Sequence, residues 1–130
     1  MRIIMPSLFL IGRILFGGFF LMMGINHFQN TRMLAHMAKQ KGVPSPQFAV
    51  YISGLLLFLG GLGVILGIHP QIALILLVVF LLPVTFQMHA FWTVSEEEAM
   101  SEMINFTKNM ALVGAALMLL MLSLPWPLSV

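Results

Sequence analysis

The sequence contains no cysteine and no aspartate, and only 8% of its 130 residues are charged. Without cysteine the chain cannot form a disulfide, present a thiolate nucleophile, or bind zinc or an iron–sulfur cluster through sulfur. Any electron chemistry would therefore depend on a borrowed cofactor. In soluble domains about a quarter of the residues are charged. The low charged fraction of this chain therefore excludes a soluble enzyme core and a disordered tail.

Apolar residues make up 60% of the chain, against six basic and four acidic residues. This composition is typical of a protein whose main partner is the lipid bilayer. The basic residues lie apart from the acidic ones, which favours a role in membrane topology over binding of nucleic acid. The length allows four spans of roughly 20 residues with short loops, and leaves no room for a separate soluble domain.

Four apolar segments have the length of a membrane span, at about 6–27, 47–67, 71–92 and 104–124. The connection Ile68-His69-Pro70 is so short that the second and third spans must form an antiparallel hairpin. We therefore predict an all-α fold, an integral membrane antiparallel four-helix bundle that forms one domain over residues 1–130.

The segments outside the spans carry local signals of their own. The polar stretch 28–46 has room for a short interfacial helix over 31–39. Ser95 and Glu98 form a capping-box pattern, which predicts that the fourth helix starts in water just after Ser95. Trp126 stands between two prolines after the fourth span, where we expect an interfacial anchor.

The second span is unusually rich in glycine. Its glycines are Gly54, Gly60, Gly61, Gly63 and Gly67. Small residues at this density let helices approach closely in lipid, and Gly63-x-x-x-Gly67 fits the small-xxx-small pattern. We therefore expect this helix to be the surface for a homo-oligomer or for a partner oxidoreductase subunit.

Alternating helix directions bring polar residues from all four spans to one face of the membrane. The first and third helices end at the face that carries the first and third loops, and the second and fourth helices begin there. The polar residues within about two helical turns of this face are Asn26, His27, Tyr51, His89, Trp92, Asn105, Lys108 and Asn109. The sequence therefore predicts a site at this face.

Helical spacing gives each span one stripe that could face the bundle interior. On the first span the stripe is Arg13, Gly17, Phe20, Gly24 and His27. On the second it is Gln47, Tyr51, Gly54, Phe58 and Gly61. On the third it is Thr85, His89 and Trp92, and on the fourth it is Asn105 and Asn109 with Lys108 beside them.

Arg13 is a charge inside the first span, where burial in hydrocarbon is costly. It lies about 21 Å along the helix from His27, close to the opposite membrane face, and no predicted span holds an acid to neutralise it. Its expected partners are backbone carbonyls, water, lipid phosphate, or an anionic or quinonoid ligand. We count Arg13 as a candidate ligand-binding residue, with simple packing as the alternative.

A metal site is not predicted. Haem ligation by His27 and His89 would need matched depth and facing rings, which no spacing here enforces, and water or helix ends could equally satisfy both rings. Methionine with histidine suits Cu(I), but the 12 methionines are spread through the chain, as expected of soft apolar filling. Haem and copper are therefore disfavoured, and the cofactor stays unknown, with quinone as one candidate.

Motifs at the ends of the spans resemble those of the DoxX family of small four-helix membrane proteins. They are Gly12-Arg13-Ile14-Leu15-Phe16-Gly17, Gly24-Ile25-Asn26-His27-Phe28, His89-Ala90-Phe91-Trp92 and Asn105-Phe106-Thr107-Lys108-Asn109-Met110-Ala111-Leu112-Val113-Gly114. The resemblance covers nearly the whole chain. It implies a link to redox chemistry, because some relatives are membrane subunits of a thiosulfate:quinone oxidoreductase and others belong to membrane oxidoreductase complexes that handle oxidative stress. A sulfur-oxidising role for this chain alone is not expected without cysteine or a soluble extension.

From these residues we hypothesise a quinone- or amphiphile-binding subunit of a membrane redox complex. His27 and His89 would hydrogen-bond a quinone carbonyl and relay protons. Lys108 and Asn109 would stabilise negative charge on the reduced ring. Tyr51 and Trp92 would pack against the plane of that ring.

Alternative functions remain open at this point. The chain could be a non-catalytic scaffold for a partner oxidoreductase or a small-molecule permease, and the sequence does not establish that it is an enzyme. We expect a prokaryotic cytoplasmic membrane with the first and third loops in the cytoplasm. That side carries Arg32, Lys39 and Lys41, against Arg2 on the other.

Overall fold

The computed structural model describes residues 3–130, so Arg2, used above for topology, lies outside the described residues. Its elements in chain order are α1 (Ile4–Gln29), α2 (Thr31–Gln40), α3 (Pro46–Leu66), α4 (Pro70–Met88), the 3-10 helix η1 (Phe91–Thr93) and α5 (Glu96–Leu120). No strand occurs over this range. Four helices, α1, α3, α4 with η1, and α5, are long and apolar enough to cross a membrane. The predicted all-α antiparallel membrane bundle is confirmed.

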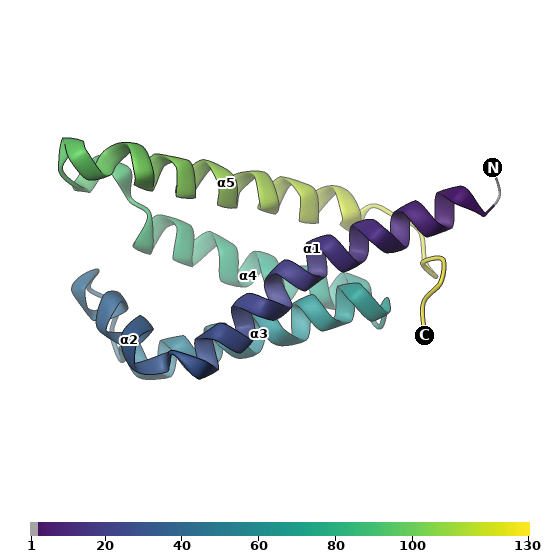
Figure 1. Ribbon diagram of the computed structural model, residues 1–130, viewed down its shortest axis with the longest axis horizontal. Helices are drawn as coiled ribbons and strands as arrows, with labels where there is room; N and C mark the ends of the chain where they lie inside the picture. Colours follow the sequence, from purple (N-terminus) through teal and green to yellow (C-terminus); the bar gives the residue numbers. More distant parts are fainter. Residues whose placement is uncertain (1–2) are drawn as a thin grey trace.

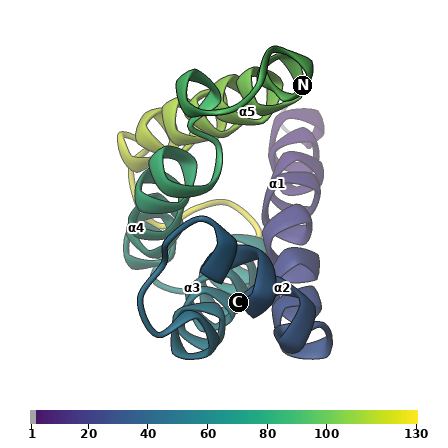
Figure 2. The same ribbon diagram turned by 90° about the vertical axis from the view of Figure 1, so that its left-hand side faces the viewer.

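The long helices run alternately in opposite directions and form an open row (Figure 1). Helix α1 packs on α3, α3 on α4, and α4 on α5, whereas α1 and α5 hardly meet. Figure 2 shows the four around an open middle, with α2 across the near end. We call the end that carries α2 and η1 the splayed end, because α1 and α5 diverge there, and the end with both termini the closed end.

A seam of glycines joins α1 to α3. A Cβ atom on Gly17 would lie 2.6 Å from the carbonyl oxygen of Gly61, and one on Gly24 would lie 2.7 Å from the amide nitrogen of Phe58. Real Cβ atoms do not approach backbone this closely, so each glycine is required by the contact. On the other side of α3, Gly60 and Gly63 meet α4. The glycines of α3 thus serve contacts within one chain, and their pattern requires no second copy.

The buried face of α1 agrees with the predicted stripe, and the buried face of α3 agrees with it only in part. On α1 the buried residues are Arg13, Gly17, Phe20 and Gly24, as predicted. On α3 they are Val50, Gly54, Leu57, Gly60, Gly61 and Val64. The predicted α3 stripe is therefore rotated by about one residue, because a helix that is apolar all round gives no contrast by which to orient it. Tyr51, placed inward by that stripe, is 45% exposed.

The helix ends refine the predicted loops. A short helix is confirmed where one was expected over 31–39, since α2 spans Thr31–Gln40. Helix α5 follows Ser95 as expected, and its first turn holds three glutamates that favour the positive end of the helix dipole. The Ser95 side chain makes no capping hydrogen bond, however, so the predicted capping box is wrong in that detail. Helix α4 ends at Met88, which makes His89 its C-cap residue.

Candidate functional site

A cavity of about 840 Å³ lies at the splayed end of the bundle. Its walls come from α1, α2, α3, α4 and α5, and most of them are apolar. Its polar side chains are Ser53, His27, Gln87, His89, Lys108 and Asn109. Four of the seven predicted site residues, His27, His89, Lys108 and Asn109, therefore share one cavity.

His27 reaches the cavity from the last turn of α1. Its Nδ1 lies 2.8 Å from the carbonyl oxygen of Met23, one turn earlier in the same helix. Its ring also meets Phe80 of α4 edge-on, with centroids 5.9 Å apart. These contacts fix the ring and leave Nε2 as its second polar atom.

His89 enters the cavity from the C-cap of α4. Its Nδ1 lies 2.7 Å from Oε2 of Glu102 in α5, and both side chains are only partly exposed. Sequence reasoning missed Glu102. The signal was present, because Glu102 continues the predicted α5 stripe one step of three residues before Asn105. The carboxylate orients the imidazole as a structural partner from a neighbouring helix.

The remaining polar wall of the cavity comes from α5 and α4. Asn109 is buried at 8% exposure, whereas Lys108 beside it is exposed and also lines the cavity. Gln87 donates its Nε2–H to the carbonyl oxygen of Lys41. That bond ties the segment after α2 to the end of α4, which holds α2 in place over the cavity.

Tyr51 and Trp92 do not line the cavity. Tyr51 faces outward on α3 and stacks on Phe28 with ring centroids 6.5 Å apart. Trp92, 57% exposed, lies among aromatic rings of α4, η1 and α5. The aromatic rings that do line the cavity are Phe19, Phe20, Phe80 and Phe86.

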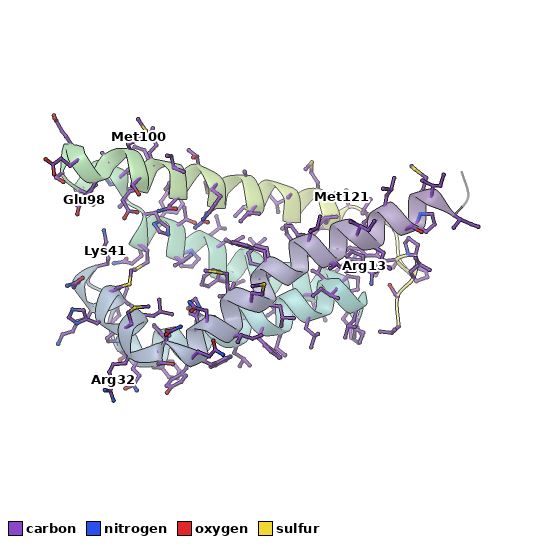
Figure 3. The ribbon with its side chains drawn as sticks, in the orientation of Figure 1. Arg13, Arg32, Lys41, Glu98, Met100 and Met121 are labelled. Carbon is purple, nitrogen blue, oxygen red and sulfur yellow. The ribbon has the colours of Figure 1, made fainter. Side chains whose placement is uncertain are left out.

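Arg13 lies near the closed end (Figure 3) and is only 2% exposed. It is not among the residues that line the cavity. Its Nε donates to the carbonyl of Val64 at 3.0 Å, Nη2 to that of Ile65 at 2.6 Å, and Nη1 to that of Pro127 at 2.6 Å. The first two carbonyls belong to the last turn of α3, where a helix has no internal donors left for them. Of the partners expected for Arg13, backbone carbonyls are the ones found.

The segment after α5 closes this end of the bundle. Trp126 is buried at 3% exposure, edge-on to Phe9 with centroids 5.2 Å apart, and its ring lies 5.8 Å from the guanidinium carbon of Arg13. The prediction of Trp126 as an interfacial anchor is therefore wrong, because the chain turns back after α5 and carries the indole inside. Val130 also donates its amide to the carbonyl of Leu66. Among residues 3–130, Trp126 Nε1 and Ser129 Oγ are buried here and find no hydrogen-bond partner.

Across residues 3–130, no group of three or more histidine or acidic side chains is placed to hold a metal ion. The His89–Glu102 pair is the one contact between a histidine and an acid found in that range.

Comparison with protein families matches residues 8–90 to the family described as DoxX, which is more than half of the chain. The matched range runs from α1 to the end of α4 and holds Arg13, His27, Tyr51 and His89. It ends before Trp92, Lys108 and Asn109. No curated protein and no solved structure matches the chain.

Proposed function

The chain belongs to the DoxX family, and from that premise we propose that it binds a quinone or a similar amphiphile at the splayed end, as a subunit of a membrane redox complex. The observation that carries this proposal is the cavity itself. It combines about 840 Å³ of mostly apolar space with polar side chains from α1, α3, α4 and α5. Ligand sites usually have volumes of about 300–1,000 Å³, apolar walls and a few polar groups that fix orientation.

The polar residues divide into two groups with different chemistry. Lys108 and Asn109 both carry N–H donors, which suit an oxygen that gains negative charge when a quinone ring is reduced. His27 and His89 approach from the ends of α1 and α4, where each imidazole offers a ring nitrogen that can hydrogen-bond a ligand. Phe80 and Phe86 supply aromatic surface for the ring, the role first expected of Tyr51 and Trp92.

Arg13 would act on the protein and not on the ligand. Its three bonded carbonyls belong to α3 and the C-terminal segment, so it holds together the end of the bundle opposite the cavity. Electrons would reach a quinone here from a bound cofactor or a partner subunit, because the chain has no cysteine with which to carry them itself.

We also propose that the protein lies in a prokaryotic cytoplasmic membrane with the splayed end on the cytoplasmic side. Arg32, Lys39 and Lys41 lie in or beside α2 at that end (Figure 3 labels two of them). The positive-inside tendency favours this orientation. A reporter enzyme that works only outside the cytoplasm, fused to the C-terminus, should be active. An inactive fusion that is expressed normally would show that the protein has the opposite orientation.

Binding of a short-chain ubiquinone to the protein in nanodiscs tests the proposed site. We expect saturable binding, and Lys108→Met should weaken it about tenfold because a charge-assisted donor is lost. Thr107→Val is the matched control, since Thr107 is its exposed neighbour on α5 and bonds only to its own helix. Absence of saturable binding by folded wild-type protein would overturn the proposal.

A further inference from the structure

Both histidines of the cavity use the same ring nitrogen for a contact within the protein. His27 Nδ1 lies 2.8 Å from the carbonyl oxygen of Met23, and His89 Nδ1 lies 2.7 Å from a carboxylate oxygen of Glu102. A carbonyl and an ionised carboxylate can only accept a hydrogen bond. In each contact, therefore, the proton is on Nδ1 and the imidazole donates it.

This assignment fixes what the other nitrogen can do. A neutral imidazole with its proton on Nδ1 has a lone pair on Nε2, so Nε2 accepts a hydrogen bond and cannot donate one. Across the described part of the chain, neither Nε2 has a hydrogen-bond partner from the protein. Both residues line the same cavity, and Nε2 is the ring nitrogen that each leaves for a ligand there.

The two oxidation states of a quinone differ in this respect. A quinone has carbonyl oxygens, which only accept, and it finds no donor at either neutral histidine. A quinol has two hydroxyl groups, each of which can donate a proton to an acceptor and still accept a bond from an N–H group. Lys108 and Asn109 supply such N–H groups on the α5 wall.

We propose that the cavity prefers the reduced, hydroxyl-bearing form of its amphiphile, with quinol hydroxyls donating to Nε2 of His27 and Nε2 of His89. This inference rests on the proposed function and specifies which ligand form the site selects. It also revises the role first given to the histidines, since donation to a quinone carbonyl would require each ring to be protonated.

The same cavity leaves a path for the apolar tail of such a ligand. Phe19, Val79 and Phe86 line the cavity and are exposed, so the cavity is open along apolar side chains of α1 and α4. An apolar tail could leave the cavity across these side chains while the polar headgroup stays inside.

The test is a comparison of the dissociation constants of decylubiquinol and decylubiquinone, measured without oxygen on the protein in nanodiscs. We expect wild-type protein to bind the quinol about tenfold more tightly, as two added hydrogen bonds would give. His27→Phe and His89→Phe should each weaken quinol binding about threefold and weaken quinone binding less, so that the ratio of the two dissociation constants falls.

Glu102→Leu tests the orientation of His89 without altering the cavity lining, because Glu102 is not part of the cavity wall. The freed ring could then carry its proton on either nitrogen, so the preference for quinol should fall about twofold. Glu97→Leu, on the exposed first turn of α5, is the matched control and should leave it unchanged. Circular dichroism and thermal unfolding establish that each variant is folded.

The outcomes separate the two proposals. Equal affinity for the two forms, or tighter binding of the quinone, overturns the preference while the proposed function stands. Binding of neither form by folded protein overturns both. A preference for quinol that survives His27→Phe, His89→Phe and their combination also contradicts the inference, because it would then come from other groups.

Discussion

Both ends of the bundle contain polar side chains that are buried or partly buried, but the ends differ in how many hydrogen bonds those side chains make to the protein. At the closed end the Arg13 guanidinium donates to three backbone carbonyls and lies against two aromatic rings. At the splayed end the His27 and His89 rings each make one hydrogen bond to the protein, and Asn109 and Lys108 line the cavity. A charged side chain that hydrogen-bonds backbone carbonyls stabilises the fold. Polar atoms in an apolar cavity that have no hydrogen-bond partner in the protein are available to a ligand.

The helix packing explains why the ends differ. Helices α1 and α3 are held together by the glycine seam, and the row continues through α4 to α5 without returning to α1. The C-terminal segment closes the remaining opening only at the end where Trp126 packs on Phe9. The opposite end has α2 as its cover, so space remains between the splayed helices.

Removing Arg13 should produce the largest effect on stability. Arg13→Leu leaves the carbonyls of Val64, Ile65 and Pro127 without their donor in an apolar setting. We expect a loss of about 3 kcal/mol or more in the free energy of unfolding, measured by denaturation in mixed micelles. Arg32→Leu, on the exposed face of α2, is the control and should stay within about 0.5 kcal/mol. Equal losses for both would show that Arg13 does not hold the closed end.

The glycine seam offers a comparison between adjacent residues of α1. Gly17→Ala would place a Cβ atom 2.6 Å from the carbonyl oxygen of Gly61, whereas a Cβ atom on Gly18 meets nothing within 4 Å. We expect Gly17→Ala to destabilise the protein by about 2 kcal/mol in the same assay. Gly18→Ala should be neutral or stabilise by about 0.5 kcal/mol, because alanine restricts the unfolded chain. A neutral Gly17→Ala would mean that α1 and α3 are not in this contact.

Gln87 connects the cover of the cavity to α4. Gln87→Leu removes the donor to the Lys41 carbonyl and should reduce stability by about 1 kcal/mol or less, since that carbonyl is near water. It should also raise hydrogen exchange in α2, measured by mass spectrometry. Gln71→Leu, at the other end of α4, is the control. If hydrogen exchange in α2 is unchanged in Gln87→Leu, the bond from Gln87 to Lys41 does not hold α2 over the cavity.

The smallest effects are expected at two aromatic residues outside the cavity. Tyr51→Phe and Trp92→Phe should change the dissociation constant of a short-chain quinone by less than about twofold, because neither side chain lines the cavity. The measurement is the nanodisc binding assay used for Lys108→Met. A tenfold loss at either position would extend the site beyond the cavity wall.

The sequence predicted the structure best where a polar residue stands among apolar ones. Arg13 is a charge among apolar residues, so the spacing of four and three residues from it identified the buried face of α1. The alternating helix directions then placed His27, His89, Lys108 and Asn109 near one membrane face, where they share a cavity. These predictions needed only helix geometry and the order of the spans.

The prediction was weakest where several faces of a helix look alike. Helix α3 is apolar all round, so nothing in its sequence distinguished the outward Tyr51 from the inward Val50. The return of the C-terminal segment over Trp126 depends on contacts with Phe9 and Arg13, far away in sequence. Glu102 lies close in sequence to the acids at the start of α5, and only the packing of α5 on α4 brings it to His89.

The most direct measurement is photoaffinity labelling with an azidoquinone in native membranes, followed by peptide mapping of the labelled sites. We expect the label, competed by excess unlabelled quinone, on the cavity walls around His27 in α1, residues 79–89 of α4, and Lys108 and Asn109 in α5. The peptide that contains Arg13 but not His27 should remain unlabelled. Two results would contradict a ligand site at the splayed end. One is labelling around Arg13 and Trp126 that excess unlabelled quinone suppresses, and the other is labelling of lipid-exposed residues on every helix that unlabelled quinone does not suppress.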